Sequence, residues 1–300
     1  MVGGENMSVA GKRITIGDRI FDTIIIIILC IAGMVILYPL LLVVSGSFSS
    51  PFALMSGQVV LFPVEPTLKL YKIVFSHPEI MRAYANTILY TGLGTLISVS
   101  LTSFAAYPLS RRDFYGRGFF TTVLMITMFF NGGMIPSFLL VKNLGLLNTI
   151  WAIVLPGAVS VYNTIVMRTF YQSNVPLELQ EAAELDGAND IQFFFKIVIP
   201  ISKAILAVMV LFYGVSHWNS WYHAFIYMSS RSKYPLQLIL REIIIQGSTN
   251  IGGATTGDTE MIGEGIKYAT MVVATVPIMC LYPFLQKYFV QGVMIGSLKG

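Results

Sequence analysis

Charged residues are absent from six long blocks of the chain, and these blocks are strongly apolar. The blocks without Lys, Arg, Asp or Glu cover residues 23–64, 83–110, 118–141, 143–167, 204–230 and 268–286. An α-helix needs about 20 such residues to cross the roughly 30 Å of hydrocarbon in a bilayer, and every block reaches or approaches that length. The pattern predicts six membrane-spanning helices, at about 22–45, 85–109, 118–141, 149–170, 201–225 and 267–289.

The composition agrees with an integral membrane protein. Of the 300 residues, 55% are hydrophobic and 11% are charged, whereas about a quarter are charged in soluble proteins. Because Lys12, Arg13 and Arg19 precede the first block, a signal peptide is an alternative for that block. The apolar run 24–44 is longer than the core of such a peptide, and no cleavage site of small residues follows promptly, so a membrane anchor is favoured.

The basic residues predict the orientation of the chain. With the N-terminus inside, eleven of the 19 Lys and Arg residues lie in inner segments, in short connections or at span ends. The others lie mostly in two long outer segments, 46–84 and 226–266, where the positive-inside rule carries least weight. We therefore expect both termini in the cytoplasm. The net charge of +4 reflects this topology and not nucleic-acid binding, since no basic patch is interleaved with aromatic residues.

The spans divide the chain into four expected parts. Residues 1–20 form a cytoplasmic tail, 21–84 hold the first transmembrane helix and an outer loop, 85–290 form a core of five transmembrane helices, and 291–300 form a second cytoplasmic tail. Gly or Pro interrupts several spans, at Asn131–Pro136, at Pro156-Gly157, and at Pro277 with Pro283. Such breaks suggest a bundle around a cavity, although Gly and Pro are also simply commoner in membrane helices.

The inner connection between the fourth and fifth spans is strongly acidic. It holds five of the 15 acidic residues, which are Glu178, Glu181, Glu184, Asp186 and Asp190. Pro176 suits the first turn of a short amphipathic helix, and Gly187 can end that helix in a left-handed conformation. A second helix, capped by Asn189 or Asp190, then runs through apolar residues to Pro200. The result is a rigid elbow at 174–200 that can pass a push from a soluble partner into the bundle; on these residues alone, the alternative is an ordinary solvated loop.

The elbow resembles the EAA motif of the permease subunits of bacterial ABC importers. That motif reads EAA, three residues, G, nine residues, I, one residue, LP. The matching positions are Glu181, Ala182, Ala183, Gly187, Ile197 and Pro200. Ile199 stands in place of the usual Leu, and Ala204 in place of a frequent later proline, and neither change threatens the elbow.

Further segments are similar to the carbohydrate-uptake branch of this family, so the resemblance covers most of the chain. They are Tyr107–Arg111, Trp218–Trp221, Tyr234–Gln237 and Gln286–Gly300. Within that branch the pattern is similar to the MalG-type permeases, and most similar to the LplC group, thought to serve oligosaccharides. The resemblance implies an all-α type I ABC importer permease fold with six transmembrane helices in the bacterial cell membrane.

The resemblance also implies partners and roles. The expected partners are a homologous permease, two cytoplasmic ABC ATPases and an extracytoplasmic solute-binding protein, with an oligosaccharide as substrate; the outer segments 46–84 and 226–266 are the expected docking surface. Met294–Lys299 could reach the ATPases, or could be a frayed terminus. The residues expected to couple the elbow to the ATPase are Glu181, Ala182, Ala183, Asp186, Gly187, Ile197 and Pro200. Glu181 would make polar contacts, Ala182 and Ala183 would permit close approach, and Gly187 would make the bend.

The chain is expected to be non-catalytic and to bind no cofactor or metal, because ATP and Mg would be bound by the partner ATPases. Its closest approach to a phosphate-binding P-loop is Gly11-Lys12. Asn6 replaces the glycine that the motif requires, and Arg13 replaces its Ser or Thr.

Candidate substrate contacts are aromatic and amide residues at membrane depth, because sugars present apolar faces and hydroxyl groups. They are Asn131, Tyr162, Asn163, Trp218, Asn219 and Trp221. Polar residues in a membrane are functional candidates by default. Alternatively, Trp and Tyr form interfacial belts, Asn joins helices by hydrogen bonds, and the partner permease holds most of the sugar.

Two rival functions have less support. An ion-driven secondary transporter predicts a charged residue at mid-membrane, but the six blocks contain none, and the sequence shows no internal repeat. A membrane-embedded enzyme predicts a signature such as H-E-x-x-H or G-x-S-x-G, and the sequence contains neither.

Overall fold

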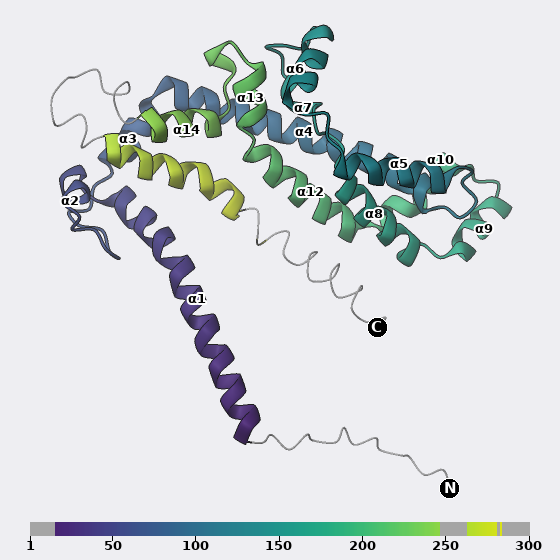
Figure 1. Ribbon diagram of the computed structural model, residues 1–300, viewed down its shortest axis with the longest axis horizontal. Helices are drawn as coiled ribbons and strands as arrows, with labels where there is room; N and C mark the ends of the chain where they lie inside the picture. Colours follow the sequence, from purple (N-terminus) through teal and green to yellow (C-terminus); the bar gives the residue numbers. More distant parts are fainter. Residues whose placement is uncertain (1–15, 247–262, 281–282, 284–300) are drawn as a thin grey trace.

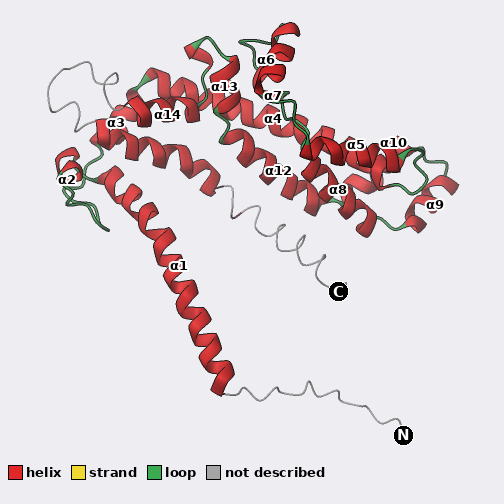
Figure 2. Cartoon of the chain, in the orientation of Figure 1, coloured by secondary structure: helices red, strands yellow, loops and turns green. Residues whose placement is uncertain are grey.

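The computed structural model describes residues 16–246, 263–280 and 283, and every regular element within these ranges is a helix (Figure 2). The elements are α1 (Ile16–Phe48), α2 (Pro51–Met55), α3 (Lys69–Ser76), α4 (Pro78–Ser110), α5 (Arg117–Phe129), α6 (Met134–Asn143), α7 (Trp151–Val154), α8 (Val161–Asn174), α9 (Leu177–Leu185), α10 (Asp190–Phe193), a π-helical turn (Phe194–Val198), α11 (Ile199–Ile201), α12 (Lys203–Trp218), α13 (Tyr222–Tyr227), a 3-10 turn (Arg231–Lys233) and α14 (Leu236–Gln246). Residues 263–280 form one more helix.

Two of these helices, α1 and α4, are long and apolar enough to cross a membrane alone. Two bent pairs pass the same test if each is taken as one span: α5 with α6, bent by 114°, and residues 190–201 with α12, bent by 81°. The described residues therefore hold two to four candidate spans by length and composition. The count of six and the inward placement of both termini stay predictions. The tail 291–300 and the end of the sixth predicted span lie outside the described residues.

Two predicted spans are interrupted at the glycines that the sequence marks. The range 118–141 forms α5 and α6 in place of one helix, and Gly133 between them has φ 86°. The range 149–170 forms α7 and α8, with φ 78° at Gly157 between them. Glycine adopts positive φ without a steric penalty, and such a residue cannot continue a right-handed helix. Neither range is therefore one continuous helix.

The central helix is α4, which packs against α8 and α12 (Figure 1). Most residues that it buries are small or carry a hydroxyl: Ala83, Thr87, Gly94, Thr95, Ser98, Thr102, Ser103 and Ala106. Small residues let membrane helices approach closely. A Cβ atom added to Gly94 would lie 2.8 Å from the His217 ring on α12, and Ser98 Oγ lies 3.1 Å from His217 Nε2. The glycine therefore makes room for a polar contact between the two helices.

One tyrosine joins three helices of the bundle. The Tyr213 hydroxyl on α12 lies 2.6 Å from Thr102 Oγ1 on α4. It also accepts a hydrogen bond of 3.1 Å from the backbone N–H of Ser160, the residue that caps α8. Because both partners are buried or partly buried, these bonds set how the three helices sit against one another.

Two clusters of buried apolar residues lie at opposite ends of the bundle. At one end α3, the start of α4, α14 and the helix 263–280 pack together around Leu70, Ile80 and Leu236. At the other end the last turns of α4 pack with α8, α9 and α12 around Tyr171, Phe193 and Met209. The predicted elbow rests on this second cluster. In Figure 1, α9 and α10 lie at the end of the bundle opposite α3 and α14.

The helix α1 contacts the other helices near α3 and otherwise extends away from the bundle (Figure 1). Its apolar side chains are exposed along nearly the whole length, among them Ile26, Leu29 and Val35. An apolar surface of this length is not stable in water. The first predicted span is therefore a helix whose sides must meet lipid or another apolar surface.

Candidate functional site

The elbow is built from local rules. Pro176 caps α9 with extended backbone, and Asp186 ends it. Gly187 then has φ 77°, and a Cβ atom added to it would meet nothing within 4 Å. Glycine is therefore required at this bend for its backbone conformation and not for lack of space.

The second arm of the elbow begins with a capping box. Asn189 Oδ1 accepts the backbone N–H of Gln192 at 2.9 Å, and Gln192 Oε1 accepts the N–H of Asn189 at 3.2 Å. Of the two predicted caps, Asn189 is the one that the structure uses. These bonds satisfy N–H groups that the first turn of a helix leaves free.

The second arm passes into α12 through a π-helical turn at Phe194–Val198, followed by α11. Pro200 in α11 has no N–H to donate to the preceding turn, so the regular hydrogen-bond ladder cannot continue through it. The chain then turns by 81° into α12. Elbow and bundle are thus joined by helical segments that bend at Ser202.

The motif residues fall on two sides of the elbow. Ala183 is 6% exposed and belongs to the apolar cluster with Phe193 and Tyr171. Ile197 is half-buried and packs against the same cluster. Ala183 thus faces the bundle of its own chain and not a partner. The remaining motif residues are exposed, namely Glu181, Ala182, Asp186, Gly187 and Pro200.

The exposed side also carries apolar residues. Leu185 is 90% exposed and Ile191 is 69% exposed. They lie at the end of α9 and the start of α10, so they flank the glycine bend. The exposed tip of the elbow around Gly187 therefore presents both aliphatic side chains and the acidic side chains of Glu181 and Asp186.

Arg111 fastens the elbow to the bundle. It is the residue that follows α4, and its side chain is only 11% exposed. Its guanidinium lies 2.9 Å from Asp113, 3.4 Å from Glu184 on α9 and 3.3 Å from Asp190 on α10. One cation therefore bridges both arms of the elbow and the end of the central helix.

Neighbouring groups hold Arg111 in place and keep it charged. Its Nη1 atom donates to the Tyr107 hydroxyl at 3.0 Å, and the guanidinium lies 6.0 Å from the centre of the Phe193 ring. Burial lowers the pKa of Arg111, but the hydrogen bond to Asp113 and the nearby negative charges outweigh it, so the pKa is raised. The hydrogen bond from Arg111 likewise lowers the pKa of Asp113. The ion pair between Arg111 and Asp113 therefore persists at neutral pH.

Sequence reasoning did not find this role of Arg111. The segment Tyr107–Arg111 was notable only for its resemblance to the carbohydrate-uptake branch. The partners Glu184 and Asp190 are distant in sequence, and no local pattern pairs them with Arg111. A cation directly after a span, opposite an acidic inner loop, was the available signal.

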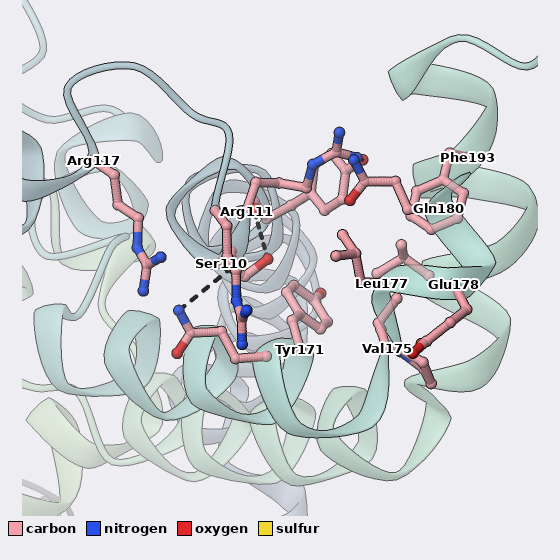
Figure 3. A pocket seen from close by; sticks show the side chains of 14 residues that line it. Ser110, Arg111, Arg117, Tyr171, Val175, Leu177, Glu178, Gln180 and Phe193 are labelled. Atoms are coloured by element: carbon pink, nitrogen blue, oxygen red, sulfur yellow. Dashed lines mark hydrogen bonds between the residues drawn. The ribbon is translucent and has the colours of Figure 1, made fainter. Parts of the chain in front are cut away.

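A cavity of about 470 Å³ lies between the elbow, the end of α4 and the end of α8 (Figure 3). The side chains that line it are Tyr107, Ser110, Arg111, Arg112, Arg117, Tyr171, Gln172, Val175, Pro176, Leu177, Glu178, Gln180, Phe193 and Val198. In Figure 3, Arg117 stands on one side of this space, and Leu177, Glu178 and Gln180 on the other. The elbow therefore lies across this cavity from the ends of α4 and α8, and the ion pairs of Arg111 connect the two sides.

The candidate substrate contacts lie in different surroundings. Asn131 is exposed in the break between α5 and α6, where its Oδ1 accepts the N–H of Gly133 at 2.9 Å. In the first turn of α8, Tyr162 is 58% exposed and Asn163 is buried. The cavity under the elbow is lined by none of the six candidates.

The three candidates near the end of α12 differ from one another. Trp218 is 5% exposed, and its Nε1 donates to the backbone oxygen of Ala274 at 2.8 Å, so it ties α12 to the helix 263–280. Asn219 is exposed, with Gln237 Nε2 at 3.4 Å from its Oδ1. Trp221 is half-buried beneath the Arg241 guanidinium, which lies 3.7 Å from its ring centre.

Two curated relatives match nearly the whole chain. Protein LplC of Bacillus subtilis (strain 168) is 40% identical over 290 residues, which are 95% of this chain and 97% of that protein. The chain belongs to the sugar ABC transporter permeases. The polygalacturonan/rhamnogalacturonan transport system permease protein YtcP of the same organism is 39% identical over 94% of this permease and 99% of its own length. No protein-family model matches the chain.

A solved structure shares the fold of this permease. It is a chain of a bacterial ABC transporter involved in the import of the acidic polysaccharide alginate, with a TM-score of 0.83 and 33% identity. The match covers 92% of this permease and 98% of that chain. The predicted resemblance to the MalG-type and LplC-like permeases is confirmed. As a permease subunit, the protein belongs to the non-catalytic part of a membrane transporter.

Proposed function

We propose that this permease forms half of the translocation path of an ATP-driven importer for oligosaccharides, with a homologous permease forming the other half. Two ABC ATPases on the cytoplasmic side and an extracytoplasmic solute-binding protein complete the assembly. Both termini of the permease lie in the cytoplasm of a bacterial cell. The single observation that carries this proposal is the match of nearly the whole chain to sugar ABC transporter permeases. The bridge from Arg111 to both arms of the elbow supports its coupling part.

The elbow acts as the coupling element because it is stiff and has one free side. Ala183 and Ile197 anchor it on the bundle, while Glu181, Ala182 and Asp186 stay exposed for the ATPase. Glu181 offers hydrogen-bond acceptors, and the small Ala182 allows a close approach. A displacement of the exposed side passes through the π-helical turn into α12, which packs on α4.

ATP supplies the energy through linkage. Its binding, with Mg, to the ATPase dimer draws the elbows of the two permeases together and favours the outward-facing state, and hydrolysis releases them. A ligand shifts such an equilibrium only by its differential affinity for the two states. The permease contributes the mechanical connection, and the nucleotide chemistry belongs to the partner subunits.

The substrate is a carbohydrate, and the name of the relative YtcP and the description of the solved structure point to acidic polysaccharides as one class to test. Asn131, Tyr162, Asn163, Asn219 and Trp221 remain proposed contacts on the path. Trp218 is better explained as a packing residue, because its one polar atom already donates to Ala274.

Purification and reconstitution test this function. We expect a second permease and an ABC ATPase to come with the chain when it is gently extracted from its native membrane. In proteoliposomes, sugar uptake should require ATP inside and the binding protein outside. Uptake that follows a proton or sodium gradient without ATP would instead identify an ion-driven secondary transporter.

Two variants test the elbow separately. Gly187→Pro and Glu181→Lys should abolish uptake while leaving the abundance of the permease in the membrane unchanged. Gln192→Glu is the matched control, since it changes charge on the elbow by one unit and keeps the oxygen that bonds Asn189. Normal uptake by both test variants at normal abundance would exclude the coupling role.

A further inference from the structure

The end of α4 and the start of α5 carry three arginines that serve different purposes. Arg111 is occupied by the carboxylates of the elbow. Arg112 and Arg117 line the same cavity, and neither forms an ion pair with any carboxylate among the described residues. Close to them, Arg168 on α8 donates its Nε to the backbone oxygen of Leu109 at 3.0 Å and repels Arg117 electrostatically. The elbow therefore does not use these three positive charges.

The one acidic residue that lines the cavity is Glu178, on the elbow. Figure 3 shows Arg117 and Glu178 on opposite sides of the space. Because Asp113 and the elbow carboxylates already neutralise Arg111, the charges left on the lining are Arg112 and Arg117 against Glu178, two positive against one negative. The N-terminus of α5, where Arg117 is the first residue, adds the positive end of a helix dipole. An anionic group is the complement of this surface.

An apolar groove is formed near the same ends of α4 and α5. It has a volume of about 290 Å³ and is lined by Ala105, Pro108, Leu109, Phe114, Phe120, Val123 and Leu124. The rings of Phe114 and Phe120 lie 5.9 Å apart at its mouth. Arg117 and Phe120 are three residues apart on α5 and so lie on neighbouring parts of one helix face. The cavity and the groove both draw lining residues from the end of α4 and the start of α5.

The groove opens toward the surroundings of the bundle and not toward its core. The helix α5 buries none of its residues, and Phe119, Ile126 and Phe129 are more than half exposed. In a membrane protein, an apolar face of this kind is covered by lipid or by another membrane subunit.

We propose that this site binds an anionic phospholipid, with the phosphate headgroup between Arg112 and Arg117 and one acyl chain along the groove of Phe114 and Phe120. Basic pockets at the cytoplasmic ends of membrane helices bind such headgroups. The assignment of this lipid to the cytoplasmic leaflet rests on the orientation proposed above. The chemical fit between the site and an anionic lipid does not depend on that orientation. Because the lipid sits under the elbow, it reinforces the end of the bundle that Arg111 clamps.

Lipid binding to the complete importer tests the site. The importer is reconstituted in nanodiscs of phosphatidylcholine with or without phosphatidylglycerol, and the lipid retained after detergent extraction is measured by native mass spectrometry. We expect phosphatidylglycerol to be retained in preference to phosphatidylcholine. Titration with short-chain phosphatidylglycerol should give about fivefold weaker binding for each of Arg112→Gln and Arg117→Gln. Arg82 is an exposed arginine near the other end of α4. The Arg82→Gln variant should therefore bind phosphatidylglycerol as tightly as the unmodified protein does.

A groove variant separates lipid from a free anion. Val123→Trp fills the apolar groove and should weaken phosphatidylglycerol binding while leaving the arginines in place. Inorganic phosphate that binds as tightly as the lipid would overturn the proposal in favour of a free-anion site. Crosslinks from position 112 or 117 to the ATPase, with no lipid retained, would overturn it in favour of a protein contact. These readouts need no sugar transport, so they stand or fall independently of the proposed import function.

Discussion

Arg111, at the end of the central helix, lies 3.4 Å from Glu184 on the first arm of the elbow, 73 residues further along the chain. The same guanidinium reaches Asp190 on the second arm. A single partly buried cation thus decides how the exposed tip of the elbow is held relative to α4.

Replacing Arg111 should loosen the elbow without unfolding the bundle. Arg111→Gln leaves Glu184 and Asp190 without their cation, and loss of hydrogen bonds to charged groups costs about 1.5–3 kcal/mol each at most. Partial exposure of the carboxylates reduces that figure. We expect faster hydrogen exchange in 177–190 and weaker coupling of ATP hydrolysis to sugar. Arg82→Gln should change neither, and unchanged exchange in Arg111→Gln would contradict the bridge.

Substitutions at Gly187 should follow the cost of its left-handed backbone. The site is open, so a side chain is tolerated sterically and only φ 77° is penalised. Asn tolerates this conformation better than Ala, for which the cost is about 1–2 kcal/mol. Uptake should therefore fall in the order Gly187→Asn, Gly187→Ala, Gly187→Pro. Equal uptake by the Asn and Pro variants would show that the bend is not needed.

A methyl group on Gly94 should push α4 away from α12. The added Cβ would lie 2.8 Å from the His217 ring, and overpacking of this kind costs about 1–3 kcal/mol. Gly94→Ala should lower the melting temperature, and His217→Ala in the same chain should restore part of the loss. Gly92→Ala is the matched control, because a Cβ there meets nothing within 4 Å. Equal melting of the two alanine variants would argue against close packing at Gly94.

Trp218 and Trp221 should respond differently to mutation. Trp218→Phe removes the donor to Ala274 and should cost about 1 kcal/mol of stability, with an unchanged KM for sugar. Trp221→Ala should raise KM if its ring lines the path, with little effect on melting because the ring is half-buried. Transport kinetics and thermal unfolding of both variants separate the two roles. A raised KM in Trp218→Phe alone would reverse the assignment.

Local features of the fold could be predicted from the sequence because they depend on neighbouring residues. The apolar block 23–64 indicated α1, Gly187 indicated the bend of the elbow, and Asn189 was one of two expected caps. The glycines near 132 and 157 marked the interruptions between α5 and α6 and between α7 and α8. In each case the backbone preference or hydrogen bond involves residues a few positions apart.

Other features needed the tertiary structure. The glycines marked a break within the range 118–141, but not the angle of 114° between α5 and α6. Ala183 looked like a partner-facing residue, and the fold buries it against Phe193. Trp218 looked like a substrate contact, and the fold pairs it with Ala274.

The sequence by itself determined that this chain is a membrane-embedded permease with a bent acidic elbow, because hydropathy, turn residues and motif spacing are properties of contiguous residues. Only the tertiary structure decided that Arg111 holds both arms of that elbow and that Arg112 and Arg117 stay free of it. The physical reason is that ion pairs between distant residues form where packing brings two helix ends together, and no local pattern encodes which ends will meet.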